Sequence, residues 1–393
     1  MHARETLPTP HASMEDAPSA PLAYSPARSV RTIWPLAPLL PAALFLIAAC
    51  TDASGPLGGT DLFANLQCSI PVSDLFAGGP PPDGIPALLN PTFVQPEDPA
   101  ASYLLAGDRI IGLEIGGQAW AIPHNIGWWH EIVNLDFPGG VNLAVTYCPL
   151  TGSSLVFDRG AAGGADFGVS GVLFQNNLVL FDRSDPASLW MQMMREARCG
   201  PADGTRLAMH AAIETTWAGW LGLHPDTRVV GSAIGMGRNY RQYPYGNYEQ
   251  TSGLLFPQPG IDLRRFAKER TLGIPEDDGS GGLLFPFEAL RDAADGSVAV
   301  ASGQARGGEV VVFWDGNAEG AMAFRPELDG EPLGFRTQAG RILDLQTGTE
   351  WRLDGLAVDG VHAGRRLAPV PEAYVAFWFA WTAFHPEAEL WQP

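Results

Sequence analysis

The sequence repeats part of itself at a nearly constant spacing, and this repeat limits the folds that the chain can adopt. The spacing is 161 residues at most matched positions (270 − 109, for example). The matched residues are Arg109, Gly112, Trp190, Trp217, Trp220 and His224, which recur as Arg270, Gly273, Trp351, Trp378, Trp381 and His385. This agreement predicts two tandem copies of one unit, over residues 105–232 and 266–393. Two copies form a pair of units, whereas a solenoid needs more repeats.

Short strands are the main predicted element of each copy. In the first copy, residues 109–115 and 118–122 are apolar runs on either side of Gly116-Gly117, which is a hairpin pattern. Connections as short as this one favour antiparallel pairing. The predicted fold class is therefore α+β and β-rich, with two tandem copies of a mainly antiparallel β unit that has two short helices each.

Two helices are predicted in the first copy. Pro123 can open a helix over residues 123–134, and a second helix is capped by Thr215 or Thr216 and ends near His224. The apolar residues at helical spacing in the first helix are Ile126, Trp129, Ile132 and Val133. His224 and His385 recur in both copies, so they are interpreted as structural residues at helix ends, where a cation or a carbonyl partner is favourable.

The N-terminal segment resembles a bacterial lipoprotein signal. Arg28 and Arg31 precede an uncharged run, residues 33–49, that is short for a membrane span of about 20 residues and ends at Ala49-Cys50. We expect residues 1–49 to be removed and Cys50 to be lipidated, although an ordinary signal peptide with a chance cysteine is the alternative. Because Thr51 rather than Asp follows Cys50, the outer membrane is favoured where the cell has one. Residues 50–104 are expected to be a tether and an extended arm rich in Pro and Gly.

The net charge limits the classes of partner that the protein can bind. The formal charge of −19 argues against nucleic acid, which normally requires a basic surface. A lipid anchor would attach the chain to a membrane, and a small-molecule or protein partner stays open.

Cys68, Cys148 and Cys199 would lie in an oxidising compartment, and their odd number leaves at least one unpaired. Pairing of Cys148 with Cys199 is one possibility.

The candidate site comes from polar residues that occur in one copy alone. At a spacing of 163 (293 − 130), the residues Gly127, His130, Glu131 and Asn134 are replaced by Leu290, Ala293, Ala294 and Ser297. On the predicted helix these four residues share one face. The pair Tyr147-Cys148 at a strand end also has no counterpart with a thiol. The second copy is therefore interpreted as a degenerate duplicate kept for packing.

These residues suggest thiol or metal chemistry. Cys148 is the candidate nucleophile or soft metal ligand, His130 lowers its pKa or shares the metal, and Glu131 orients the histidine or acts as a base. Copper or zinc is the expected metal, and Asn134 and Tyr147 are candidate ligand contacts. The alternative is that Cys148 is simply a small buried residue. Whether the protein is an enzyme stays open.

A second hypothesis is a non-catalytic binding or scaffold module. The segment between the copies, residues 233–265, contains four tyrosines and two arginines within eleven positions, a composition typical of recognition surfaces. Its candidate ligand contacts are Arg238, Tyr240 and Tyr245.

Several motifs resemble an uncharacterised bacterial family of exported proteins, the domain of unknown function 3179. They are the stretches His130–Asn134, Thr146–Gly152, Phe167–Gly171, Asp83–Pro91, Gly200–Leu207 and His224–Thr227. The resemblance covers residues 80–391 and implies an exported protein without an established activity. Family members often have a second cysteine in the turn after Cys148. Thr151 stands there in this chain, which argues against dithiol chemistry.

Overall fold

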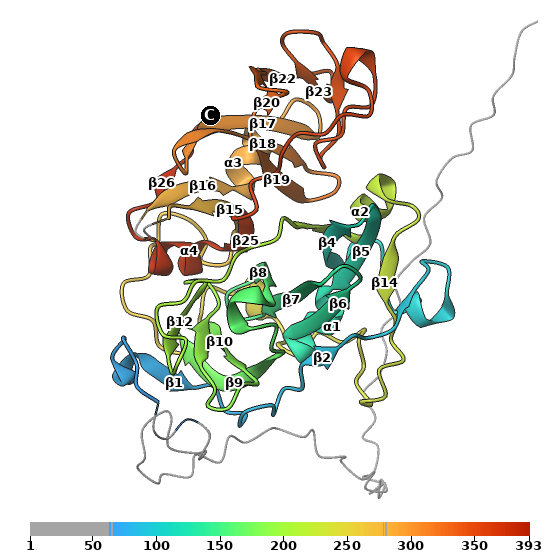
Figure 1. Cartoon of the computed structure of the whole chain (residues 1–393). Helices are drawn as coiled ribbons and strands as arrows, with labels where there is room; N and C mark the ends of the chain where they lie inside the picture. Colours follow the sequence, from blue (N-terminus) through green and yellow to red (C-terminus); the bar gives the residue numbers. More distant parts are fainter. Residues whose placement is uncertain (1–62, 64–65, 278, 280) are drawn as a thin grey trace, which may run out of the picture. The chain divides into compact units, whose positions relative to one another are not determined.

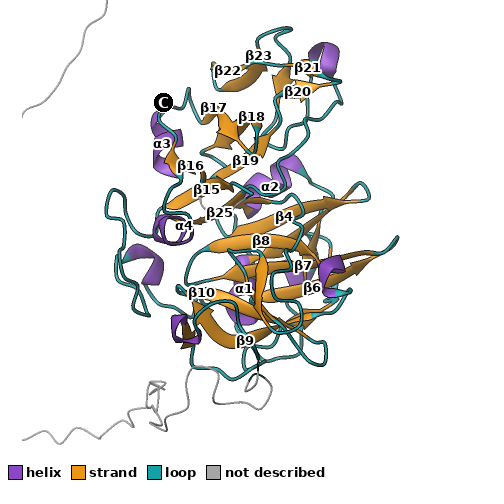
Figure 2. Cartoon of the chain, turned by 60° about the vertical axis from the view of Figure 1, so that its left-hand side comes forward, coloured by secondary structure: helices purple, strands orange, loops and turns teal. Residues whose placement is uncertain are grey.

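Strands dominate the structure and confirm the β-rich prediction. The computed structural model describes residues 63, 66–277, 279 and 281–393, and these residues form mainly antiparallel sheets with four short α-helices (Figures 1 and 2). The predicted signal segment 1–49 and Cys50 lie outside the described residues. None of the helices in the described part of the chain has the length and apolar character that a membrane span requires. The helices are α1 (His124–His130), α2 (Trp217–Leu223), α3 (Phe287–Asp292) and α4 (Trp378–Phe384).

The largest sheet joins strands from both predicted copies. Its eight strands lie in the order β17 (Val298–Ala305), β18 (Gly308–Asp315), β19 (Gly320–Phe324), β13 (Ile213–Thr216), β4 (Arg109–Ile115), β5 (Gln118–Pro123), β14 (Arg228–Val230) and β3 (Phe93–Val94). The junction is the antiparallel pair β13–β19, where Glu214 is the register partner of Ala321. Strand β19 thus lies between β18 and β13.

Five smaller sheets complete the fold. One has the order β25 (Tyr374–Phe377), β15 (Arg270–Pro275), β16 (Gly282–Pro286) and β26 (Glu389–Leu390). A second has the order β2 (Leu88–Leu89), β6 (Ile132–Phe137), β7 (Val141–Cys148) and β8 (Ser153–Asp158). A third has the order β1 (Leu75–Ala77), β9 (Phe167–Phe174), β10 (Asn177–Asp182), β11 (Leu189–Met191) and β12 (Glu196–Cys199).

The remaining strands belong to the C-terminal part of the chain, where β22 (Phe335–Gln338), β23 (Arg341–Asp344) and β24 (Glu350–Trp351) form one sheet and β20 (Glu327–Leu328) pairs with β21 (Glu331–Pro332). Short 3-10 turns lie at η1 (Val72–Asp74), η2 (Pro99–Ala101), η3 (Arg159–Ala162), η4 (Tyr248–Gln250) and η5 (Gly360–His362).

The N-terminal region (105–232) and the C-terminal region (266–393) share a strand order. In the first, β13-β4-β5-β14 has two antiparallel pairings followed by a parallel one, and β25-β15-β16-β26 has the same order and the same directions. The close approach of Gly112 to the ring of Trp220 is repeated by Gly273 and Trp381. The tandem duplication stays a prediction, with which this shared order agrees.

The two regions also share apolar core. Trp378 and Trp381 of α4 pack in the same buried cluster as Trp190 and Cys148 of the N-terminal region. Segments that precede residue 105 add short strands at the sheet edges: β1 pairs with β9, β2 with β6, and β3 with β14. The described part of the expected arm is thus extended, and it lies along the N-terminal region.

The first predicted helix is shorter than expected. It ends at His130, and Ile132–Phe137 form strand β6 instead. Glu131 closes the helix with a φ of 56°, and the β-branched pair Ile132-Val133 then pairs with β7. Because Ile132 and Val133 fit both a helical and a strand pattern, the spacing was ambiguous. The face shared by Gly127, His130, Glu131 and Asn134 therefore does not exist.

The structure decides which cysteines pair, a question that the sequence left open. Cys199 forms a disulfide with Cys68, and Cys148 is unpaired and buried. The possibility that Cys148 pairs with Cys199, which the sequence left open, is thereby excluded, and the expectation of at least one unpaired cysteine is confirmed. Cys148 lies at the end of β7 in an apolar cluster, away from the bridge that ties Cys68 to β12.

Candidate functional site

His130 uses both ring nitrogens within the protein. Its Nδ1 lies 2.8 Å from the Pro86 carbonyl oxygen, and its Nε2 lies 2.8 Å from the Tyr240 hydroxyl. The residue is fully buried, and this burial lowers the pKa of the imidazole. A metal at His130 would have to displace one of these two contacts.

The side chain of Cys148 lies on the face of strand β7 opposite to that of Tyr147. Consecutive strand residues point to opposite faces, so Cys148 and Tyr147 belong to different buried clusters. Tyr147 shares its cluster with Tyr240, the partner of His130. The structure therefore does not bring together the two predicted metal ligands, His130 and Cys148.

The environment of Cys148 also disfavours a thiolate. The residue is 1% exposed, and its Sγ donates to the carbonyl oxygen of Asn176 at 3.8 Å. Burial, with a contribution from the neighbouring Glu131 carboxylate, raises the pKa of the thiol to about 11. The thiol is therefore protonated near neutral pH, and its nucleophilicity is low.

Glu131 is an isolated buried carboxyl. The residue is 9% exposed, and its side-chain carboxyl forms no hydrogen bond or ion pair with any described residue. Burial raises the pKa of this carboxyl to about 8. Its charge and that of Cys148 both contribute to raising the pKa of Tyr245, after burial. The structure thus places Glu131, Cys148 and Tyr245 near one another, which the sequence did not predict for the tyrosine.

The other predicted contacts have structural partners. Asn134 clamps the backbone of Phe167, accepting from its N–H at 2.9 Å and donating to its carbonyl oxygen at 2.9 Å. Tyr147 stacks on His124 at a centroid distance of 4.0 Å. Arg238 lies over the ring of Trp129, at 5.1 Å from its centroid.

The Tyr-rich segment packs inward. Tyr240 and Tyr248 are buried, while Tyr243 and Tyr245 are half-buried. The Tyr248 hydroxyl donates to the Leu150 carbonyl oxygen at 2.8 Å. The segment therefore offers a partner less aromatic surface than its composition suggests.

A buried charge network centres on Glu214, a residue that no pattern in the sequence singles out. Arg109 Nε donates to Glu214 Oε1 at 2.6 Å, and Arg270 Nε reaches the same oxygen at 3.3 Å. Ser154 Oγ donates to the other carboxylate oxygen at 2.6 Å. Burial disfavours the charged carboxylate, but Arg109 and its neighbours hold the pKa of Glu214 at about 2. The two arginines are the residues that the repeat matched at 109 and 270.

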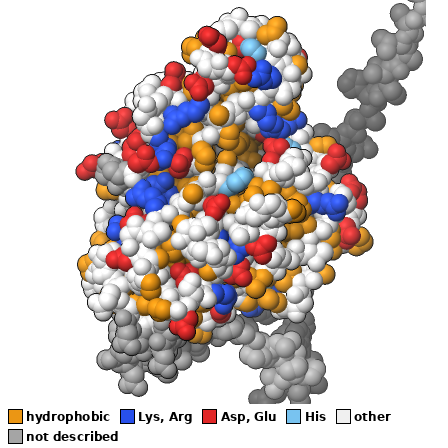
Figure 3. All heavy atoms as spheres, in the orientation of Figure 1, with side chains coloured by type: hydrophobic (Ala, Val, Ile, Leu, Met, Phe, Trp, Pro, Cys, Tyr) orange, Lys and Arg blue, Asp and Glu red, His pale blue; other side chains and the backbone are white. Residues whose placement is uncertain are grey.

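A cleft between the two regions is a further candidate site. It has a volume of about 390 Å³, and its polar rim contains Glu114, His210, His224, Asp354 and Arg366. Its apolar walls include Ile213 and Trp220 on one side and Met322, Phe324 and Leu367 on the other. A hollow lined by hydrophobic side chains, with a histidine and charged groups of both signs around it, is visible in Figure 3.

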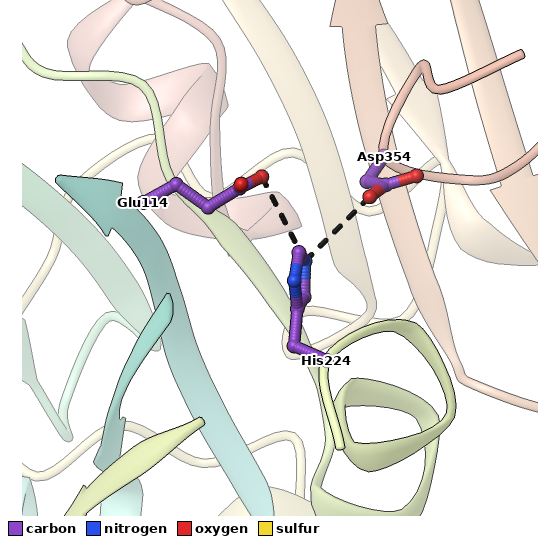
Figure 4. Close-up of side chains that lie close together, drawn as sticks. All are labelled: Glu114, His224 and Asp354. Carbon is purple, nitrogen blue, oxygen red and sulfur yellow. Dashed lines mark ion pairs between the residues drawn. The ribbon is translucent and has the colours of Figure 1, made fainter. Parts of the chain in front are cut away.

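Three side chains that could ligate a metal converge in this cleft (Figure 4). Glu114 comes from β4, His224 follows the last turn of α2, and Asp354 follows β24. His224 Nε2 lies 3.7 Å from Glu114 Oε1 and 3.6 Å from Asp354 Oδ2. Sequence reasoning placed His224 at a helix end, as observed, and missed the two carboxylates. The spacing of residues 114, 224 and 354 along the chain matches no metal-binding motif, because only the pairing of the sheets brings these positions together.

Comparison with known proteins agrees with the sequence motifs. The family described as "Protein of unknown function (DUF3179)" matches residues 82–388. No curated protein matches the chain, and no solved structure matches it. Since the match spans most of the sequence, the chain belongs to the DUF3179 family.

Proposed function

We propose that the protein is a lipid-anchored extracytoplasmic protein that binds a small molecule in the cleft between its two regions. The carrying observation is the convergence of a few charged side chains, Glu114, His224 and Asp354, on a cleft with mainly apolar walls. Binding sites for small molecules have this composition, in which the apolar wall supplies affinity and the polar groups supply orientation.

Two observations support the proposed location. The sequence has a basic segment, an apolar run and Cys50 in the order of a lipoprotein signal. The disulfide between Cys68 and Cys199 suits an oxidising compartment. Fractionation of cells that carry the wild type or Cys50→Ala tests the anchor. We expect the wild type in the membrane fraction and the variant in the extracytoplasmic soluble fraction. An unchanged distribution would contradict lipidation at Cys50.

Cleft binding can be tested with an aromatic fluorescent anion, 1-anilinonaphthalene-8-sulfonate, in buffer that contains EDTA. Met322→Trp places a bulky ring in the cleft, whereas Leu345→Trp alters an exposed side chain outside it. We expect saturable probe fluorescence in the wild type and in Leu345→Trp, with most of it lost in Met322→Trp. Equal binding by all three proteins would contradict a binding site in this cleft.

A second candidate function is thiol or metal chemistry at Cys148 and Glu131. The unpartnered, buried Glu131 carboxyl beside the thiol favours it, because an acid with a raised pKa can exchange a proton near neutral pH. Elemental mass spectrometry of the wild type and Cys148→Ser tests the metal version. Near-stoichiometric copper or zinc that disappears in the variant would support it, and equal metal content in both proteins would contradict it.

A further inference from the structure

One nitrogen in the cleft lacks a partner. His224 Nε2 is buried and has no hydrogen-bond partner among the described residues, although it points between two carboxylates. The side chain is 10% exposed, and its ring lies 4.1 Å from that of Trp220, measured between centroids. A buried polar atom without a partner is costly, and a metal ion is one partner that would satisfy it.

The spacing of the three ligand atoms suits zinc. Imidazole nitrogen and carboxylate oxygen are both zinc ligands at about 2.0–2.2 Å, so neighbouring ligands in a tetrahedral site lie roughly 3.3 Å apart. The separations of 3.6 and 3.7 Å from His224 Nε2 are within a few tenths of an ångström of that value, and all three atoms lie within 4.8 Å of one another. The three ligands include no thiolate, the soft ligand type that would favour copper.

A cationic side chain, Arg366, already lies between the two carboxylates of the proposed site. Arg366 Nη1 lies 3.1 Å from Glu114 Oε1 and 3.2 Å from Asp354 Oδ2, the same two oxygens that face His224. The Arg366 side chain is 38% exposed and can turn outward, whereas Arg352 donates to both carboxylate oxygens of Asp354, through Nε to Oδ1 at 3.0 Å and through Nη2 to Oδ2. An ion at the centre would take the place of Arg366 as the counter-ion of the two carboxylates. Arg352 would still hold Asp354 in its orientation.

The corresponding histidine of the C-terminal region provides an internal control. His385 follows α4 as His224 follows α2, and its Nε2 also lacks a described partner. Its Nδ1 bonds to the Gly279 carbonyl oxygen at 3.0 Å, and Pro275 stands where the repeat places the counterpart of Glu114. No ion pair to a carboxylate of a described residue is formed by His385, so it lacks the ligand set that surrounds His224.

We infer that Glu114, His224 and Asp354 form a divalent-cation site, for zinc in preference to magnesium or calcium, in which the ion displaces Arg366. With three protein ligands, the ion keeps an open position, and all three ligands line the cleft. A small molecule with an anionic or neutral donor group would complete the coordination from the cleft. The inference deepens the proposed function, and its role in ligand binding rests on that function.

Zinc titration by calorimetry tests the site. The protein is stripped with EDTA, exchanged into metal-free buffer and titrated with zinc, and then with magnesium and calcium as comparisons. We expect one zinc per chain in the wild type, and an affinity at least about tenfold lower in His224→Asn and in Glu114→Gln, since even outer contacts of a metal site cost this much. His385→Asn and Glu387→Gln are the matched controls and should bind zinc as the wild type does. Absence of zinc binding by the wild type, or equal affinity in His224→Asn and His385→Asn, would overturn the inference.

Two further variants keep the test decisive. Glu114 is 36% exposed, so Glu114→Gln tests the site even if His224→Asn does not fold. Arg366→Gln removes the proposed competitor and should bind zinc more tightly than the wild type, and weaker binding would overturn the inference. Because the fluorescent probe is measured in EDTA, normal probe binding without zinc binding would refute the cation site and leave the proposed function intact.

Discussion

His224 and His385 occupy equivalent places in the two regions, yet only one of them faces a potential site. Each follows the last turn of a Trp-x-x-Trp helix, and its ring lies near the ring of the second tryptophan, at 4.1 Å in one region and 5.2 Å in the other. His385 has a backbone carbonyl as its partner, whereas His224 has two carboxylates from different parts of the chain. The local framework is thus shared, and the neighbours decide the chemistry.

Glu214 and Val375 are a second pair of equivalent positions with different chemistry, and both are buried. Glu214 lies on β13 and Val375 on β25, at equivalent positions of the shared strand order. Arg109 and Arg270, which match each other in the repeat, both reach Glu214. The two matched arginines therefore share an acid that exists in one region alone, although Arg270 also pairs with Glu249 at 2.8 Å.

The largest expected effect comes from Glu214→Ala. Two arginines would lose a buried carboxylate, and removal of one partner from a buried ion pair costs about 3–5 kcal/mol. Val375→Ala, the equivalent change in the other region, removes apolar atoms alone and should cost about 2 kcal/mol. Urea unfolding of both variants at pH 7 measures the difference. A smaller loss in Glu214→Ala than in Val375→Ala would show that the network contributes little.

The next effect is a pH dependence that belongs to Glu131. Burial raises its folded-state pKa from 4.5 to about 8, so the fold favours the protonated acid. This contribution to stability is fully present below about pH 4.5 and is lost as the pH rises through 8. The equivalent position holds Ala294, so no such dependence arises there.

Glu131→Gln should remove this dependence. Between pH 6 and pH 8 the wild type should lose about 2 kcal/mol from this group, and the variant should not. Urea unfolding midpoints over this pH range provide the measurement, with Glu288→Gln, an exposed residue of α3, as the control. If the variant and the wild type lose stability in parallel, Glu131 is not the responsible group.

The smallest expected difference lies between Gly112→Ala and Gly273→Ala. An added Cβ would come within 2.5 Å of Trp220 in one region and within 2.4 Å of Trp381 in the other. Overpacking of this kind costs roughly 1–3 kcal/mol, and the two variants should lose nearly the same amount. Thermal or urea unfolding tests this equality. A large loss in one variant and none in the other would mean that the two Gly–Trp contacts are not equivalent.

Much of the local structure was predictable from the residues. The hairpin predicted over 109–122 is observed as β4 and β5, and Thr216 caps α2 by accepting from Gly219 N–H. The end of the first helix was not predictable, because Ile132 and Val133 suit both spacings until β7 offers them a strand partner. The separation of His130 and Cys148 has a different cause, because strand pleating turns Cys148 away from the cluster that contains Tyr240.

The sequence by itself determined the β-rich character, the helix ends at His224 and His385 and the family, because these depend on local pattern and composition. Tertiary structure alone decided which cysteines pair, that Glu131 is buried without a partner, and that Glu114, His224 and Asp354 meet. The physical reason is distance along the chain. Pairing of β13 with β19 joins strands about a hundred residues apart, and no local preference specifies which distant strand completes a sheet.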